Sequence, residues 1–480
     1  MTVSYSSGGK SYALELTSLS DVAGAQHARA RPMLVGRGVR ARAASGAPID
    51  AGTMLPALAA SAFMKQRIRT DDSGSVMVAV RSARRGARRP GAPVAATTMI
   101  ATRTLIVEGA RSADLKAARD AGAHVIHEGL DGKALLQCDD VAQVFTVAKM
   151  LVERQVGAAV PNFLRRVSRL PQSAPSRPWA HAKIGVAAAW KITKGRPDVR
   201  VAVLDEGVDT SHPALRAAVV GAKDFIGGNG DSAMPDGDDA HGTACAGIVV
   251  SRDKVVRGVA PNCSLLAGRI AMGDGTPNGW VFDDYATADA VDWAWRNGAA
   301  VISNSWGGGL PSDAISRAFG RARTQGRDGK GALVVIAAGN SQEPVDFPGD
   351  LPGYVTVGAS TPRDEWKSRT SSDGERWGSN YGPTLWVLAP GVFIWTTDIA
   401  GPRGDDAGDF TKTFNGTSAA TPHVAGAAAL MFSANPALTA SEARDILKRT
   451  ATLVPGQTGW TEKEGWGRLH VGRAVKAARK

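Results

Sequence analysis

Near-continuous apolar runs, separated by helical stretches, are the feature that most limits the folds this sequence can adopt. Runs of this kind are typical of strands that are buried on both faces of a parallel sheet. The clearest helical stretches between them are residues 286–296 and 312–324. The pattern predicts a doubly wound, mostly parallel α/β domain over residues 181–480, with ligands bound at the carboxyl ends of its strands. The apolar runs are residues 199–204, 265–270, 299–303, 332–337, 354–357 and 385–388.

The rest of the chain divides into three segments. Residues 101–167 show the element order βαββαβ, with helices expected at 112–121 and 141–154, which predicts a small ferredoxin-like α+β unit. A proline-rich stretch, residues 168–180, is predicted to be a linker. Residues 1–100 are a basic extension to which the sequence assigns no clear structure or role.

Charge and composition argue against several classes of protein. The net charge is +12, and arginines gather at residues 28–42 and 81–89. Few aromatic residues interleave with these arginines and no nucleic-acid-binding motif follows, so we expect a solvated arm and no specific nucleic-acid partner. Tight, salt-sensitive DNA binding by residues 1–100 would overturn that expectation. No run of about 18 apolar residues is present, so we expect no membrane span.

The cysteine content and the N-terminal residues bear on the compartment. Three cysteines do not make a disulfide framework. Residues 1–16 are polar and lack the apolar core of a secretory signal, which as written predicts a cytoplasmic protein. A wrongly assigned start or another export route would instead make it a secreted protein.

A serine near the C-terminal end is the first candidate for chemistry. Ser418 follows Gly416 and Thr417, and an apolar run extends from residue 424 to 431. This pattern predicts a tight turn and then a helix buried on nearly all sides, with Pro422 in its first turn. A hydroxyl at such a helix start suits a nucleophile. An ordinary helix cap is the alternative.

Three more polar residues could complete a site around Ser418. Asp205 ends the first apolar run, His241 opens a run of small residues, and Asn340 follows the fourth apolar run. His241 would take the proton of the serine hydroxyl, Asp205 would hold the imidazole, and the Asn340 amide would donate to an oxyanion. Each residue alone has a structural alternative as a cap or turn residue. Together they supply every role of one mechanism.

The segments that carry these residues resemble those of subtilisin-like serine proteases, the subtilases. The matching segments are 203–209, 241–243 and 416–422, and the order Asp, His, Ser is the subtilisin order. The similarity spans about residues 180–478. It implies a serine endopeptidase that hydrolyses peptide bonds of a protein or peptide substrate through an acyl-enzyme, with no cofactor required for catalysis. An inactive pseudo-protease that serves as a binding scaffold is the alternative.

The resemblance also implies where a substrate binds. An extended substrate would pair with one edge formed by residues 303–307, and the loop 272–275, with Gly273, would form the opposite edge. Glu206 resembles the acidic residue of the kexin and furin branch and predicts a preference for a basic residue just before the last acyl-side residue. The acidic pair that this branch carries after its Ser-Trp-Gly is absent. The first edge consists of Ser303, Asn304, Ser305, Trp306 and Gly307.

The βαββαβ unit resembles a subtilase propeptide, a domain that assists folding and then inhibits the enzyme until it is cleaved off. The resemblance predicts that this unit is an intramolecular inhibitor, with self-cleavage between about Phe163 and Pro175. A permanent accessory domain is the alternative. Subtilases often hold structural calcium, and the acidic residues before His241 could supply oxygen ligands, but their spacing assigns no metal site. These acidic residues are Asp231, Asp236, Asp238 and Asp239.

Overall fold

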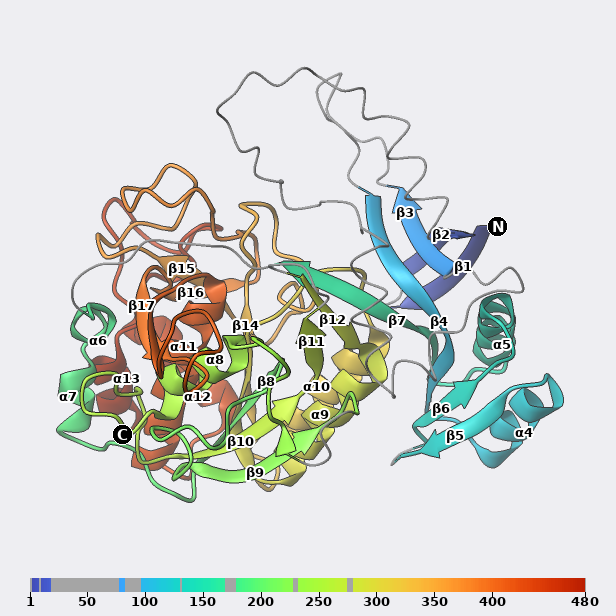
Figure 1. Cartoon of the computed structure of the whole chain (residues 1–480), viewed down its shortest axis with the longest axis horizontal. Helices are drawn as coiled ribbons and strands as arrows, with labels where there is room; N and C mark the ends of the chain where they lie inside the picture. The colour runs from blue at the N-terminus through green and yellow to red at the C-terminus, as the bar shows by residue number, and fades with distance from the viewer. Residues whose placement is uncertain are drawn as a thin grey trace, which may run out of the picture. The chain divides into compact units, whose positions relative to one another are not determined.

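The computed structural model describes residues 2–7, 10–18, 77–82, 96–129, 132–168, 178–227, 232–273 and 279–479 (Figure 1). The described residues belong to two compact units. The first unit comprises residues from Met1–Ser168, Asp274–Tyr285 and Gly309–Ile315. The second comprises residues from Arg169–Gly273, Ala286–Gly308 and Ser316–Lys480.

A seven-stranded sheet in the order β16-β15-β14-β13-β8-β10-β9 forms the centre of the second unit. Every neighbouring pair is parallel, which confirms the doubly wound α/β prediction. The chain passes from β8 to one side of the sheet and then crosses to the other side, so β8 lies at the point where the strand order reverses. The strands are β8 (Arg200–Asp205), β9 (Val219–Asp224), β10 (Ser264–Arg269), β13 (Ala299–Asn304), β14 (Leu333–Ala337), β15 (Val355–Ser360) and β16 (Leu385–Pro390).

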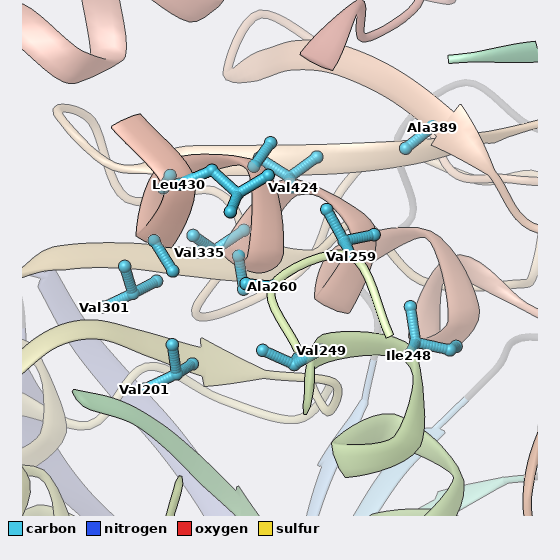
Figure 2. Packing of buried hydrophobic residues seen from close by; sticks show 14 of the residues in the cluster. Val201, Ile248, Val249, Val259, Ala260, Val301, Val335, Ala389, Val424 and Leu430 are labelled. Atoms are coloured by element: carbon cyan, nitrogen blue, oxygen red, sulfur yellow. The ribbon is translucent and has the colours of Figure 1, made fainter. Parts of the chain in front are cut away.

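Helices α8 (His241–Val250) and α11 (Thr417–Ala434) pack together over one face of this sheet. Both are rich in small residues, which allows the helix backbones to come close to the strands. Figure 2 shows side chains of this core, among them Val335 of β14, Val249 of α8 and Val424 of α11. Further helices extend this layer, namely α6 (Ala180–Lys183), α7 (Val186–Trp190), α12 (Ala440–Thr450) and α13 (Val471–Ala478).

Helices α9 (Asp284–Arg296) and α10 (Asp313–Gln325) lie over the opposite face. Trp293 of α9 lies against two strand glycines, where a Cβ would approach the indole to 3.7 and 3.8 Å. Arg321 of α10 donates to the carboxylate of Asp292 of α9 at 2.7 Å and joins the two helices. Short strands complete the unit, namely β11 (Ala271–Gly273) and the antiparallel pair β17 (Ile394–Thr397) and β18 (Phe410–Phe414).

The first unit contains the βαββαβ order expected over residues 101–167. Its strands follow the order β5-β6-β4-β7, and all pairs are antiparallel. The Asp140 side chain accepts from Gln143 N at 2.8 Å and begins α5, whose apolar face includes Phe145 and Leu151 in the core of the unit. The elements are β4 (Ala96–Glu108), α4 (Ser112–Asp120), β5 (His124–Glu128), β6 (Ala134–Gln137), α5 (Val141–Glu153) and β7 (Ala158–Ser168).

Other strands extend this sheet at two places. The meander β1 (Thr2–Ser7), β2 (Lys10–Ser18) and β3 (Met77–Ser82) pairs through β3 with the first part of β4. Strand β12 (Gly279–Asp283) pairs antiparallel with the last part of β7. Within the described ranges, no helix is both long and apolar enough to cross a membrane.

Candidate active site

Asp205 and His241 form a buried pair at the carboxyl end of β8. Asp205 ends the strand, His241 begins α8, and His241 Nδ1 lies 2.9 Å from Asp205 Oδ1. A carboxylate only accepts, so this contact places a proton on Nδ1 and leaves Nε2 for other chemistry. Gly242 permits the approach of helix to strand, because a Cβ there would lie 2.0 Å from the carbonyl oxygen of Gly207.

Glu206 contacts the start of α8. Its side chain is fully buried, and Oε1 accepts a hydrogen bond from His241 N at 2.7 Å. A carboxylate at a helix N-terminus satisfies an amide that has no intrahelical partner and interacts favourably with the helix dipole. In this structure the carboxylate supports the backbone of His241, and the role of Glu206 in substrate binding stays a prediction.

Ser418 lies in the first turn of α11, beside the end of β13. Its hydroxyl donates to Ser305 O at 3.1 Å rather than to His241, and Ser305 Oγ donates to Ser418 O at 3.1 Å. The Cys245 side chain contacts both Ser418 and the histidine, and Phe414 contacts the histidine. Cys245 Sγ lies 3.6 Å from Ser418 O and 3.9 Å from His241 Nδ1, and the Phe414 ring packs edge-on against the imidazole at 5.2 Å.

Asn340, just after β14, is held in place by the turn that precedes Ser418. Its Oδ1 accepts from Thr417 N at 2.8 Å and from Thr417 Oγ1 at 3.0 Å, so its Nδ2 is turned the other way. Gly416 has a φ of +110°, and a Cβ there would lie 3.1 Å from Nδ2. Among the residues that the structure describes, none accepts a hydrogen bond from this Nδ2. Asn340 therefore presents a fixed donor beside Ser418.

The segment 303–307 divides at the end of β13. Ser303 is aligned with β8 on one side and β14 on the other, and Asn304 Nδ2 donates to Val335 O in the neighbouring strand. These two residues lie inside the sheet, so their assignment to a substrate edge is wrong. Ser305, Trp306 and Gly307 continue beyond the strand, and they remain candidates for that edge.

Trp306 fixes the start of the segment 305–307, which continues beyond β13. Its side chain is buried, Nε1 donates to Leu204 O at 3.1 Å, and the ring stacks on Phe319 of α10. The indole therefore ties the segment to the end of β8, one residue before Asp205.

Gly273 ends β11, and its loop continues into residues 274–278, which lie outside the described ranges. Gly273 N donates to Asp239 Oδ2 at 2.9 Å, and a Cβ on Gly273 would meet this carboxylate at 2.6 Å. The contact fixes the strand end from which the loop leaves. The proposed opposite edge is therefore described only at its beginning.

The acidic residues before His241 do not fit a shared calcium site. Asp231 lies outside the described residues. Asp236 pairs with the buried Arg269, Asp238 Oδ1 accepts from Gly404 N at 3.2 Å, and Asp239 accepts from Gly273 N. A calcium cage needs several oxygens that converge on one point. These carboxylates are each bonded to a different part of the chain.

His423 is a buried histidine of α11 that the sequence analysis did not consider. Its Nδ1 donates to Ala419 O, one residue after Ser418, at 2.8 Å. Burial lowers the pKa of His423 to about 3, with a further lowering by the nearby His181, so the ring is neutral at ordinary pH. The ring of His181 lies 6.5 Å away. The two rings form a neutral pair beneath the first turn of α11.

Comparison with known proteins gives consistent matches. The profile of the subtilase family matches residues 196–467. A calcium-dependent protease of Nostoc sp. is 31% identical over 392 residues, 70% of this chain and 56% of that protein. Thermitase of Thermoactinomyces vulgaris is 34% identical over 63% of this chain and 96% of its own length. The chain thus spans about half the length of the Nostoc relative.

Among solved structures, fervidolysin of Fervidobacterium pennivorans, described as a keratinolytic enzyme related to subtilisin, has a similar fold. The TM-score is 0.62 at 22% sequence identity, over 82% of this chain and 62% of that chain. At this level of identity the likeness concerns the fold.

Proposed function

The chain belongs to the subtilase family, and from this premise we propose that it is a serine endopeptidase with Ser418 as its nucleophile. The observation that carries the proposal is the buried contact between Asp205 and His241, 2.9 Å long, beside the helix start that holds Ser418. Family membership alone would suit an inactive relative equally well. The retained pair supplies the base that a serine nucleophile needs.

In the proposed acylation step, Ser418 Oγ attacks the carbonyl carbon of the scissile peptide bond. The hydroxyl first turns away from Ser305 O, and His241 Nε2 takes its proton as the C–O bond forms. Asp205 accepts from Nδ1 and stabilises the imidazolium. When the tetrahedral intermediate collapses, the C–N bond breaks and His241 gives the proton to the leaving amine. Water then attacks the acyl-enzyme while His241 Nε2 takes its proton. When the second tetrahedral intermediate collapses, the ester C–O bond to Ser418 breaks, His241 returns the proton to Ser418 Oγ, and the acid product is released.

Two donors would stabilise the negative oxygen of the intermediate. Asn340 Nδ2 is one, because its Oδ1 is fixed by Thr417 and leaves the amide hydrogens for an acceptor on the substrate. The backbone N–H of Ser418 is the other, since amides in a first helical turn have no intrahelical partner. Donors placed before the reaction begins stabilise charge without reorganisation.

We further propose that residues 101–168 are an inhibitory propeptide. The described pairing of β7 with β12 supports this, because β12 belongs to the stretch that the family profile covers and β7 belongs to the βαββαβ unit. The antiparallel register runs from Leu164 opposite Asp283 to Ser168 opposite Gly279. A cut inside that ladder would break it, so self-cleavage is proposed between Ser168 and Pro175.

Intact mass of the purified chain over time, beside Ser418→Ala, tests both proposals. Loss of an N-terminal fragment of about 168–175 residues from the wild type alone would support an active serine and the propeptide assignment. A fluorophosphonate probe then separates the alternatives. Labelling of Ser418 without self-cleavage supports an endopeptidase that needs another protease for maturation. The absence of both labelling and self-cleavage would favour the pseudo-protease.

A further inference from the structure

A fully buried polar contact joins β7 to β12. Asn162 Nδ2 donates to Asp283 Oδ2 at 2.5 Å, and both residues have no exposed surface. The two residues are 121 positions apart in the chain. Asp283 lies opposite Leu164 in the ladder, and Asn162 is two residues before Leu164 in β7. The side chains therefore meet beside the last pair of the ladder, where β7 enters it.

The Asn162 amide is oriented by an irregularity in β4. The β4–β7 register runs from Ala101 opposite Phe163 to Leu105 opposite Pro161, so three residues of β4 face Asn162 alone. Such bulges redirect side chains and often accompany functional positions. Here the bulge brings two threonine hydroxyls to Asn162.

One hydroxyl holds the backbone of Asn162 and the other holds its side-chain amide. Thr102 Oγ1 donates to the backbone carbonyl oxygen of Asn162 at 2.6 Å, and Asn162 Nδ2 donates to Thr104 Oγ1 at 3.0 Å. Of the two amide hydrogens, one is thus directed at Thr104 of β4 and the other at Asp283 of β12. The donor is set in place before β12 pairs, which lowers the entropy cost of the contact.

Asp283 makes the edge of β12 selective for the strand that pairs with it. Backbone hydrogen bonds alone would not distinguish one strand from another, so specificity must come from side chains. A buried carboxylate is costly unless it receives hydrogen bonds, and charge-assisted bonds are the strongest of these. A strand with an apolar or acidic residue at the position of Asn162 would not offer this donor.

We propose that Asp283 is the recognition residue by which β12 retains the βαββαβ unit, with Asn162 as its matched donor. The inference rests on the proposed propeptide function and names the contact that sets how long the cleaved unit stays bound. Loss of this contact speeds release. Exchange of the two side chains restores retention, because a carboxylate on β7 would then accept from an amide on β12 and from the hydroxyl of Thr104.

The test uses full-length chains that carry Ser418→Ala, so that its reading does not depend on activity. Limited trypsin treatment is followed by intact mass, chains with a single cut after Arg169 are selected, and size-exclusion chromatography over time gives the dissociation rate of their N-terminal fragment. The variants are Asn162→Asp, Asp283→Asn and the exchange of both. Glu128→Gln is the control, since it removes a carboxylate of the same unit that is 59% exposed.

We expect Asp283→Asn to speed dissociation by about 10- to 100-fold, the range for loss of a hydrogen bond to a charged group. Asn162→Asp places two carboxylates together and should exceed that effect. The exchanged pair should return to within about threefold of the parent, and Glu128→Gln should match it. The proposal is overturned if Asp283→Asn leaves the dissociation rate unchanged. It is also overturned if the exchanged pair dissociates as fast as the single variants. Inactivity of the wild type would overturn the proposed function alone.

Discussion

His241 Nδ1 lies 2.9 Å from Asp205 Oδ1, and the two side chains are 5% and 0% exposed. This contact fixes which imidazole nitrogen carries the proton. It is the part of the proposed mechanism with the most direct geometric basis, and the first prediction follows from it.

Asp205→Asn should abolish most activity without unfolding the protein. The amide keeps the size of the carboxylate but can present its NH₂ group to Nδ1, which stabilises the wrong tautomer and withdraws support from the imidazolium. We expect kcat on a peptide anilide to fall by about 10⁴. Far-UV circular dichroism should stay unchanged. A loss below about tenfold would contradict the role of Asp205.

Asn340→Asp separates the two functions of the Asn340 side chain. The carboxylate can still accept from Thr417, but it cannot donate to an oxyanion. We expect kcat to fall by about 10²–10³, while KM stays within about threefold. Thr417→Val is the matched control, because it removes one contact to Asn340 Oδ1 and leaves the Nδ2 donor. A rise in KM with unchanged kcat would instead indicate a substrate-binding role.

Glu206→Ala should lower stability and leave substrate preference unchanged. The variant loses the acceptor of His241 N, and we expect the free energy of unfolding to fall by about 2 kcal/mol. Urea unfolding in the Ser418→Ala background measures this without self-digestion. Glu206→Gln keeps an acceptor and should lose less. A preference for Arg over Ala peptides that disappears in Glu206→Gln would support the prediction that this residue forms a subsite.

Stability should decline with acid because of His181 and His423. Burial lowers the pKa of His181 from 6.5 to about 4 and that of His423 to about 3. Below pH 6.5 the unfolded chain therefore binds more protons than the folded chain, and the free energy of unfolding falls as pH drops from 6.5 towards 4. Each histidine contributes a slope of about 1.4 kcal/mol per pH unit.

His181→Leu should remove one of these contributions. Urea unfolding at pH 7, 6 and 5, again in the Ser418→Ala background, compares the slope with that of the parent. Equal slopes in the two proteins would show that His181 takes up no proton on unfolding. A common loss of stability at every pH would show only a packing effect.

The sequence predicted the parts of the molecule that depend on local pattern. Apolar runs of four or more residues identified the strands that are buried on both faces. Strand β9 was not predicted, because it is an edge strand without a continuous apolar run. Its segment Val219–Asp224 is only partly buried, and Val220 is 53% exposed. The sequence also did not show where a strand stops being paired. Ser303 and Asn304 were therefore predicted to form a substrate edge, although Ser303 is paired on both sides.

Residue contacts across the fold could not be predicted from the sequence. The direction of the Glu206 side chain depends on where α8 begins relative to β8, which the pattern of apolar residues does not determine. Asn162 and Asp283 are separated by 121 positions, and a bulge sets the orientation of the amide. Such contacts depend on strand register, which shifts every side chain when it changes by one residue.

The burial of α11 bears on how such a protein would survive its own proposed activity. Every residue from Thr417 to Ser433 is buried, so this helix has no solvent face along which it could fray. Local opening there would disrupt the core, which places it near the cost of global unfolding. A protease in solution is destroyed mainly through chains that unfold, and its lifetime is then a matter of the unfolding rate. Packing the nucleophile's helix into the interior links the persistence of the active centre to the slowest opening the fold has.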